Sequence, residues 1–286
     1  MGPAGAVTAP DLRPVTISTM APGRGRPLRL FVTGGSGYLG SELVTRSRRA
    51  GLATTAPPSG VVDLLDGRSV SEAIEAARPD VVVHTAYRSD RPSIVDATRH
   101  VVEATVAVEA RLIHISSDVV FGGRSMPYTE GDHPDPVHDY GRWKYEAEAL
   151  VAAGSFASLI VRTSLIYARS SMSPHDITVR EAAMGRSQIE FFTDEIRSPV
   201  FVDDLAGALV RVARERDIDG VLHLAGPRQL SRSELADISC ERFGWDASRL
   251  KTTTLAASGL VRPGRVVLES SRAGELGIVL DGPGRS

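Results

Sequence analysis

Short apolar runs alternate with amphipathic segments along most of the chain. Apolar, β-favouring runs occur at 28–33, 52–56, 81–84, 112–115, 157–166 and 221–224. Segments with apolar residues at helical spacing occur at 39–49, 69–77, 94–108, 140–153, 177–184, 200–215 and 231–243. The unbroken run at 81–84 is typical of a strand covered on both faces. This alternation predicts an α/β protein with a doubly wound parallel sheet and right-handed crossovers.

Two of the predicted helices carry local signals at an end. The helix at 69–77 must stop before Pro79, because proline cannot continue a helix. The last helix has Ser231 in front and Glu234 three residues later, which predicts a capping box.

Residues 1–27 show neither pattern. They are rich in Pro, Gly and Ala, and such a segment buries too little apolar surface to fold alone, so we expect a disordered leader. It lacks the apolar stretch of a secretory signal. Translation could start at Met1 or at Met20.

A glycine-rich turn joins the first strand to the first helix. Gly34 permits the tight turn, Gly37 lets the backbone approach a pyrophosphate, and Gly40 lets the helix sit close to its strand. The free N–H groups and the dipole of the helix N-terminus would face the phosphates. Strand, turn and helix together predict a dinucleotide site in a Rossmann fold.

The end of the second strand bears on the choice of cofactor. An acidic residue that binds the adenine ribose is expected there, but the chain has Thr54-Thr55-Ala56-Pro57-Pro58. A carboxylate would repel the 2′-phosphate of NADP, and its absence permits NADP without requiring it. We therefore predict NADPH or NADH, with a slight preference for NADP.

A Tyr–Lys pair and a serine make a candidate site for carbonyl chemistry. Tyr140 and Lys144 are one helical turn apart and share a face. A tyrosine hydroxyl has a pKa near 10, and a nearby ammonium favours its ionised form. Ser117 follows the strand at 112–115, at the edge of the sheet where ligands bind. The three could polarise a C=O group and supply its proton while the cofactor supplies hydride.

The composition narrows the classes of protein. The chain has 286 residues and a net charge of −2, so it lacks the basic footprint of a nucleic-acid or membrane-surface protein. No apolar run approaches the roughly 18 residues of a membrane span. The single Cys240 excludes an internal disulfide and a Cys-based zinc site, and favours the cytoplasm. The histidines show no metal-ligand spacing, so we predict no metal.

Nine segments resemble the extended short-chain dehydrogenase/reductases, and among them most closely the dTDP-4-dehydrorhamnose reductase group and its relative, the β regulatory subunit of methionine adenosyltransferase. They are VTGGSGYLG at 32–40, VDLLD at 62–66, PDVVVHTA at 79–86, LIHISSDVVFGG at 112–123, PYTEGDHPDP at 127–136, YGRWKYEAE at 140–148, LIVRTSLIY at 159–167, SPVFVDDLA at 198–206 and GVLHLAG at 220–226. The similarity extends from about Leu28 to Arg262-Pro263.

The resemblance implies roles for individual residues. Tyr140 would be the general acid, Lys144 would hold the ribose and lower the Tyr140 pKa, and Ser117 would bind the substrate oxygen. Gly37, Tyr38 and Leu39 would meet the pyrophosphate, with Gly34 and Gly40 in the same cofactor-binding turn. Asp63 and Leu64 would lie by the adenine, and Thr85, Ala86 and Tyr87 would line the cofactor channel. Asp118, Arg197 and Arg262 are candidates for binding the substrate, the two arginines through its phosphates.

The resemblance also implies an organisation and an activity. Residues 28–166 and 200–225 would bind NAD(P), and 167–199 and 226–286 would form a smaller substrate lobe. The expected reaction is NAD(P)H-dependent reduction of a keto group on a nucleotide-linked deoxysugar. Alternatives are an epimerase or dehydratase that retains NAD, a reductase of a non-sugar ketone, and a non-catalytic regulatory subunit. Trp143, where relatives have a small residue, suggests an unusual substrate, and the helices at 94–108 and 140–153 would suit a homodimer.

Overall fold

The computed structural model describes residues 26–154 and 157–284. The expected disordered leader therefore lies outside the described residues, apart from Arg26 and Pro27. Arg26 pairs with Asp80 at 2.6 Å, so the chain enters the fold beside the third strand of the sheet.

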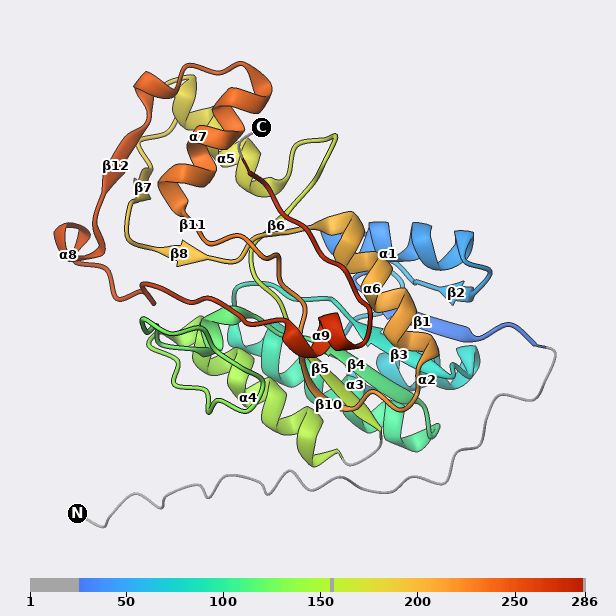
Figure 1. Cartoon of the computed structure of the whole chain (residues 1–286). Coiled ribbons are helices and arrows are strands. Elements are labelled where there is room, and N and C mark those ends of the chain that lie inside the picture. The colour runs from blue at the N-terminus through green and yellow to red at the C-terminus, as the bar shows by residue number, and fades with distance from the viewer. Residues whose placement is uncertain (1–25, 155–156, 285–286) are drawn as a thin grey trace, which may run out of the picture.

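A six-stranded parallel sheet forms the centre of the larger body, in the order β10-β5-β4-β3-β1-β2 (Figure 1). Its strands are β1 (Arg29–Thr33), β2 (Ala53–Thr55), β3 (Val81–His84), β4 (Arg111–Ile115), β5 (Ser158–Arg162) and β10 (Gly220–His223). The predicted doubly wound fold is confirmed. The strand order reverses between β1 and β3, and ligands of such sheets bind at that point, beyond the carboxyl ends of the strands.

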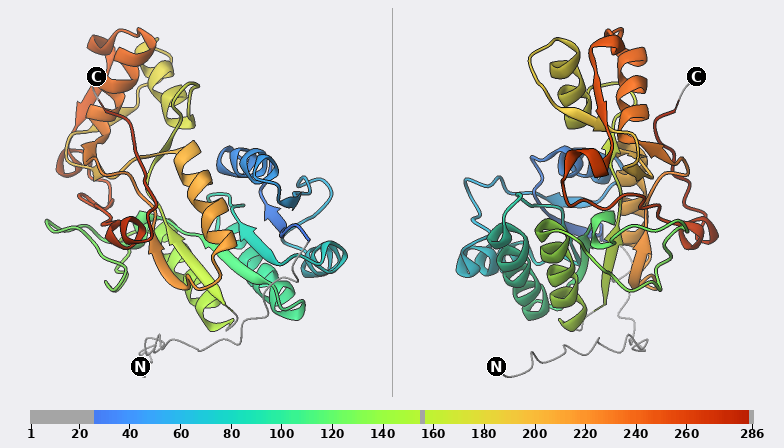
Figure 2. Two further views of the ribbon diagram at one scale, coloured as in Figure 1. Left: turned by 45° about the vertical axis from the view of Figure 1, so that its right-hand side comes forward. Right: turned by 90° about the vertical axis from the view of Figure 1, so that its left-hand side faces the viewer.

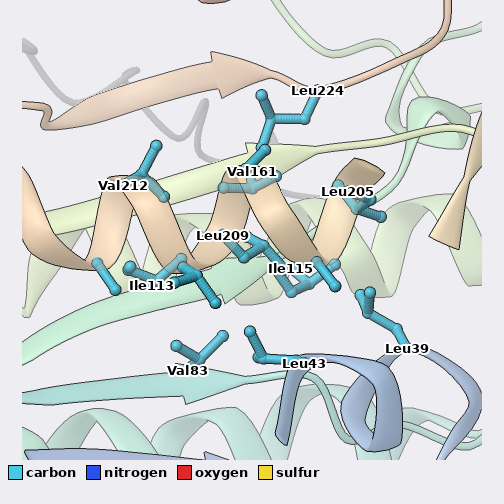
Figure 3. Packing of buried hydrophobic residues seen from close by; sticks show 14 of the residues in the cluster. Leu39, Leu43, Val83, Ile113, Ile115, Val161, Leu205, Leu209, Val212 and Leu224 are labelled. Atoms are coloured by element: carbon cyan, nitrogen blue, oxygen red, sulfur yellow. The ribbon is translucent and has the colours of Figure 1, made fainter. Parts of the chain in front are cut away.

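Helices cover both faces of the sheet (Figure 2). One face carries α1 (Tyr38–Arg49) and α6 (Val202–Arg214), and the other carries α2 (Gly67–Ala77), α3 (Ala97–Ala107) and α4 (Asp139–Ala153). Leu205 and Leu209 of α6 pack between Leu43 of α1 and Ile113 of β4 (Figure 3). Each fully buried leucine contributes roughly 1.5–3 kcal/mol.

Two predicted helices differ in detail from the structure. The helix expected at 69–77 begins earlier, because the Asp66 side chain accepts a hydrogen bond from the Arg68 N–H and caps α2. The helix expected at 94–108 is divided. It starts with a π-helical turn, η1 (Pro92–Asp96), and continues as α3.

A smaller lobe follows β5. It contains β6 (Ile166–Tyr167), α5 (Pro174–Ala183), β7 (Glu190–Phe192), β8 (Ile196–Arg197), β9 (Val200–Phe201), β11 (Leu230–Ser231), α7 (Arg232–Phe243), η3 (Ala247–Arg249), β12 (Lys251–Thr253) and α8 (Leu255–Ser258). Its core lies between α5 and α7, where Val179, Ala236 and Cys240 are buried. Ser231 and Glu234 form the predicted capping box of α7.

Residues 266–278 return to the larger body, before the chain runs back toward the lobe (Figure 1). Val266 and Leu268 pack against Phe121, and α9 (Ser271–Glu275) places Ala273 in the core under α1 and α6 together with Ile278. Residues 266–278, which the resemblance placed in the lobe, therefore pack on the larger body.

Candidate active site

The glycine turn lies at the switch point of the sheet and leaves no room for side chains at two positions. Gly34 has φ +70°, and a Cβ atom there would lie 2.7 Å from the Ala86 Cα atom. A Cβ atom on Gly40 would lie 2.0 Å from the Gly34 carbonyl oxygen. The turn, α1 and the segment after β3 are thus in direct backbone contact.

The N-terminus of α1 has the features of an anion site. Its N-cap is Gly37, which provides no capping side chain, and its first turn has no acidic residue. The first N–H groups of the helix are therefore free to bind an anion. The side chain of Leu39 is buried in the core, so only its backbone could contact a ligand. The buried Tyr38 hydroxyl has no hydrogen-bond partner within the described ranges. A helix N-terminus without a capping side chain, preceded by an exposed glycine, fits a pyrophosphate.

The segment 85–87 connects the glycine turn to the Tyr–Lys pair. Thr85 Oγ1 donates to the Thr33 carbonyl oxygen at 2.7 Å, which fixes the segment beside β1. Tyr87 is 56% exposed, and its ring centroid lies 6.1 Å from that of Tyr140. The Lys144 ammonium lies 4.8 Å from the centroid of the Tyr87 ring.

Ser117 and Lys144 lie at the carboxyl edge of β4, and Tyr140 precedes Lys144 by one turn of α4. Lys144 is 4% exposed, and its Nζ atom donates to the Ile115 carbonyl oxygen at 3.1 Å. Ser117 comes two residues later and caps the short helix η2 (Asp118–Val120). A Cβ atom on Gly141 would lie 2.3 Å from the Val119 carbonyl oxygen, so this glycine lets α4 approach the serine.

Burial sets the charges of the pair. Desolvation lowers the pKa of Lys144 to about 8, against the opposing effect of Glu148. Burial, followed by Tyr87 and Asp118, raises the pKa of Tyr140 above its usual value of 10. In the free protein Tyr140 is therefore a protonated phenol that holds its proton firmly, and the expected lowering of its pKa by Lys144 is not found in this state.

A neutral histidine lies beneath the lysine. Burial and Lys144 lower the pKa of His84 to about 3. Thr98 Oγ1 donates to the Ile94 carbonyl oxygen, so it accepts from His84 Nε2, while His84 Nδ1 accepts from the Thr33 hydroxyl at 2.7 Å. The imidazole is fully hydrogen-bonded and adds no second positive charge to the site.

The predicted substrate residues occupy different positions. Asp118 and Arg197 are 3% and 1% exposed, and both are engaged by other protein groups. The side chain of Arg262 is 41% exposed and pairs with Glu195 at 2.6 Å. Among these three residues, only Arg262 presents a group to solvent.

The predicted adenine residues lie in the turn between β2 and α2. Asp63 Oδ1 accepts from the Leu65 N–H at 2.9 Å, which stabilises this turn. The Leu64 side chain packs against the core under α2 and α3. These contacts give both residues a structural role alongside the predicted one.

Sequence reasoning overlooked one residue at the site and placed another too close to it. His138 Nδ1 accepts from the Gly141 N–H at 3.0 Å and caps α4, two residues before Tyr140. Its position just before a predicted helix was the available signal. Trp143, which was expected to border the substrate, packs with Ile94 and Val95 between α4 and η1.

Other kinds of site have less support. Within 26–154 and 157–284, no group of three or more His, Cys, Asp or Glu side chains could hold a metal ion. No helix in these ranges is long and apolar enough to cross a membrane.

The chain is similar in sequence to known proteins over most of its length. The sequence matches the RmlD substrate binding domain family over residues 28–281. It is 31% identical over 265 residues to the dTDP-4-dehydrorhamnose reductase of Mycolicibacterium smegmatis, which covers 87% of this chain and 80% of that protein. It is 28% identical over 277 residues to the methionine adenosyltransferase 2 subunit beta of Bos taurus, covering 87% and 83%.

A solved structure shows the same fold. The dTDP-4-dehydrorhamnose reductase of Bacillus anthracis, in complex with NADP, matches with a TM-score of 0.80 and 24% identity, over 90% of this chain and 95% of that chain. The resemblance inferred from the sequence is confirmed. The chain belongs to the RmlD substrate binding domain family.

Proposed function

We propose that the protein reduces a keto group on a nucleotide-linked deoxysugar with NADPH or NADH. The observation that carries the proposal is the convergence of the glycine turn, Tyr87 and the Ser117–Tyr140–Lys144 trio at one edge of the sheet. Relatives named dTDP-4-dehydrorhamnose reductase support the substrate class, and the NADP complex of one of them supports the cofactor.

Each member of the trio has a distinct task. In the free protein the single Ser117 hydroxyl proton is donated to Asp118 Oδ1 at 3.2 Å. With substrate bound, the hydroxyl would rotate and donate it to the substrate carbonyl oxygen instead, which draws electron density toward that oxygen. The Tyr140 hydroxyl transfers its proton to the same oxygen as general acid. Lys144 holds the nicotinamide ribose and stabilises the phenolate that remains on Tyr140. The cofactor, when bound, supplies the hydride.

We also propose which residues bind the cofactor and that the protein prefers NADPH to NADH. The backbone at Gly34, Gly37 and Gly40 holds the pyrophosphate. The second strand ends without a carboxylate, and Arg48 Nη2 lies 3.5 Å from the Thr54 carbonyl oxygen, so this end suits a phosphate better than a bare ribose. NADPH is the preferred donor in this proposal.

The test is cofactor oxidation by purified protein mixed with NADPH or NADH and a dTDP-4-keto-6-deoxysugar. We expect substrate-dependent oxidation that is lost in Tyr140→Phe, while both proteins bind NADPH equally. Oxidation that persists in Tyr140→Phe would assign the proton to another group. Cofactor binding without oxidation would leave a non-sugar ketone, a retained-NAD reaction or a regulatory role.

The regulatory role has its own support in the similarity to methionine adenosyltransferase 2 subunit beta. It predicts binding to a methionine adenosyltransferase catalytic subunit, measurable by calorimetry, with no NADPH oxidation. The presence of all three members of the trio favours the reductase. We also propose that the reaction takes place in the cytoplasm. We propose further that the protein forms a homodimer through α3 and α4.

A further inference from the structure

Asp118 is a buried residue that follows Ser117 in the sequence and is hydrogen-bonded to its hydroxyl group. Its Oδ1 atom accepts from Ser117 Oγ at 3.2 Å, and its Oδ2 atom accepts from Ser164 Oγ at 2.6 Å. Arg197 Nε lies 3.7 Å from the same Oδ2 atom. At 3% exposure, this carboxylate cannot contact a substrate in the described state.

Arg197 is the largest fully buried side chain and binds two segments of the lobe together. Its guanidinium donates to the carbonyl oxygens of Pro263 and Gly264, at 2.8 and 2.5 Å. It also lies 3.4 Å from Glu195 Oε1. The residue therefore fixes the backbone immediately after Arg262.

Glu195 completes a row of charges. It is 2% exposed on its side chain and accepts from Arg262 Nε at 2.6 Å and from Arg262 Nη2 at 3.1 Å. The row runs from Ser117 through Asp118, Arg197 and Glu195 to Arg262. Ser117 belongs to the larger body and Arg262 to the lobe, so the row crosses between them.

A second contact runs parallel to the first. Ser164 Oγ, which donates to Asp118, accepts from the Ser198 N–H at 3.2 Å. Asp118 is thus connected to the strand of Arg197 both through the guanidinium and through a backbone amide.

The energetics of buried ion pairs favour a role for this row in positioning the residues that it connects. Burying an ion pair costs desolvation energy that its attraction often fails to exceed, so a buried pair is weak evidence for stability alone. Breaking one, in contrast, leaves an uncompensated charge and moves the groups around it. The row combines hydrogen bonds at its two ends with ion pairs of 3.7 and 3.4 Å around Arg197, and this pairing of buried charges specifies one arrangement of the two bodies.

We propose that Asp118 and Arg197 are positioning residues that fix Ser117 relative to Arg262, and so hold the reacting carbonyl and the anionic end of one substrate at a set separation. The inference rests on the proposed function for the identity of that substrate. It assigns no substrate contact to either residue.

Kinetics provide the first test. Asp118→Asn keeps the shape and removes the charge, and we expect kcat to fall about tenfold while NADPH affinity is unchanged. Because Asp118 acts through Ser117, the same substitution placed in Ser117→Ala should cause almost no further loss. Equal losses in the two backgrounds would overturn the inference.

Hydrogen exchange provides a test that needs no substrate. In Arg197→Lys we expect faster exchange of the amides at 118–121, which belong to the larger body and not to the lobe that holds Arg197. In Asp118→Asn we expect faster exchange of the amides at 196–198 and 264–266. The matched control is Arg111→Lys, since Arg111 is a buried arginine that donates to the carbonyl oxygens of Val212, Glu215 and Ile218 at the far end of the sheet.

The two tests separate the failures. If wild-type protein oxidises no NADPH but each substitution speeds exchange in the other body, the proposed substrate is wrong and the positioning role stands. If exchange changes only next to each substitution, or equally in Arg111→Lys, the positioning role is wrong. Asp118→Asn, which keeps the side-chain shape, decides the matter should Arg197→Lys fail to fold.

Discussion

The Lys144 ammonium on α4 lies 4.8 Å from the centroid of the Tyr87 ring, beside the cofactor channel that we propose. The cation is otherwise held by one hydrogen bond to the Ile115 carbonyl oxygen. Burial disfavours its charge and the ring favours it, so its protonation is sensitive to its few neighbours.

The reduction should therefore lose rate at mildly alkaline pH. Lys144 is charged below its pKa and neutral above it, and that pKa is lowered to about 8. We expect kcat/KM for the nucleotide sugar to fall as pH rises through this value, measured with saturating NADPH. A profile that stays flat well above it would show that the charge of Lys144 is not needed.

Tyr87 should tune that profile through its ring rather than its hydroxyl. A cation–π contact at an exposed site is worth about 0.5–1 kcal/mol, which corresponds to roughly half a pH unit. Tyr87→Leu should move the alkaline fall to lower pH by about that amount, while Tyr87→Phe should leave it in place. Equal shifts in both variants would assign the effect to the hydroxyl.

Gly40 should not tolerate a methyl group. The Cβ atom of Gly40→Ala would collide with the Gly34 carbonyl oxygen, and we expect a loss of about 1–3 kcal/mol in unfolding free energy together with weaker NADPH binding. Gly60→Ala is the control, since a Cβ atom there has nothing within 4 Å. Urea unfolding and cofactor titration would measure both. Similar behaviour of the two variants would contradict the close contact.

Acid should destabilise the fold through its buried histidines. The pKa of His84 is lowered to about 3 and that of His223 to about 4, mainly by burial, against 6.5 in the unfolded chain. Below pH 6.5 the unfolded state binds more protons, so stability falls as pH drops toward the folded-state values, by about 1 kcal/mol per histidine at pH 5.5. His84→Gln should show a shallower decline in urea unfolding than wild type, and the exposed His133→Gln should not.

The cap at His138 should matter for both stability and rate. His138→Ala removes the acceptor for the Gly141 N–H and should cost about 1 kcal/mol, whereas His138→Asn can replace it. Because Tyr140 lies in the first turn of α4, fraying in the alanine variant should also lower kcat. Thermal unfolding and initial rates would decide, and an asparagine variant as damaged as the alanine variant would argue against capping.

The sequence predicted those parts of the site that depend on local patterns. The glycine turn, the i, i+4 spacing of Tyr140 and Lys144, and the capping box of Ser231 each lie within a few residues. The positions of Asp118 and Arg197 depend on contacts between segments far apart in the chain. No periodicity reveals that two charged residues will be buried against each other, so exposure was the natural expectation.

Element boundaries show the same limit. Apolar spacing at 94–108 indicated a helix correctly, but Asp90 accepts from the Ser93 N–H, and the chain begins to coil at Pro92. The packing of residues 266–278 on the larger body could not be predicted either, because a few apolar residues do not show which part of the protein they pack against.

The return of the chain to its first body has a consequence for biosynthesis. The core of the larger body is completed by three late parts of the chain, namely strand β10, Ala273 and Ile278. Until these are synthesised, one edge of the sheet and part of the apolar interior are uncovered. Such long-range closure is slow, and exposed edges invite aggregation. A ribosome-bound chain should thus engage chaperones until its final stretch emerges.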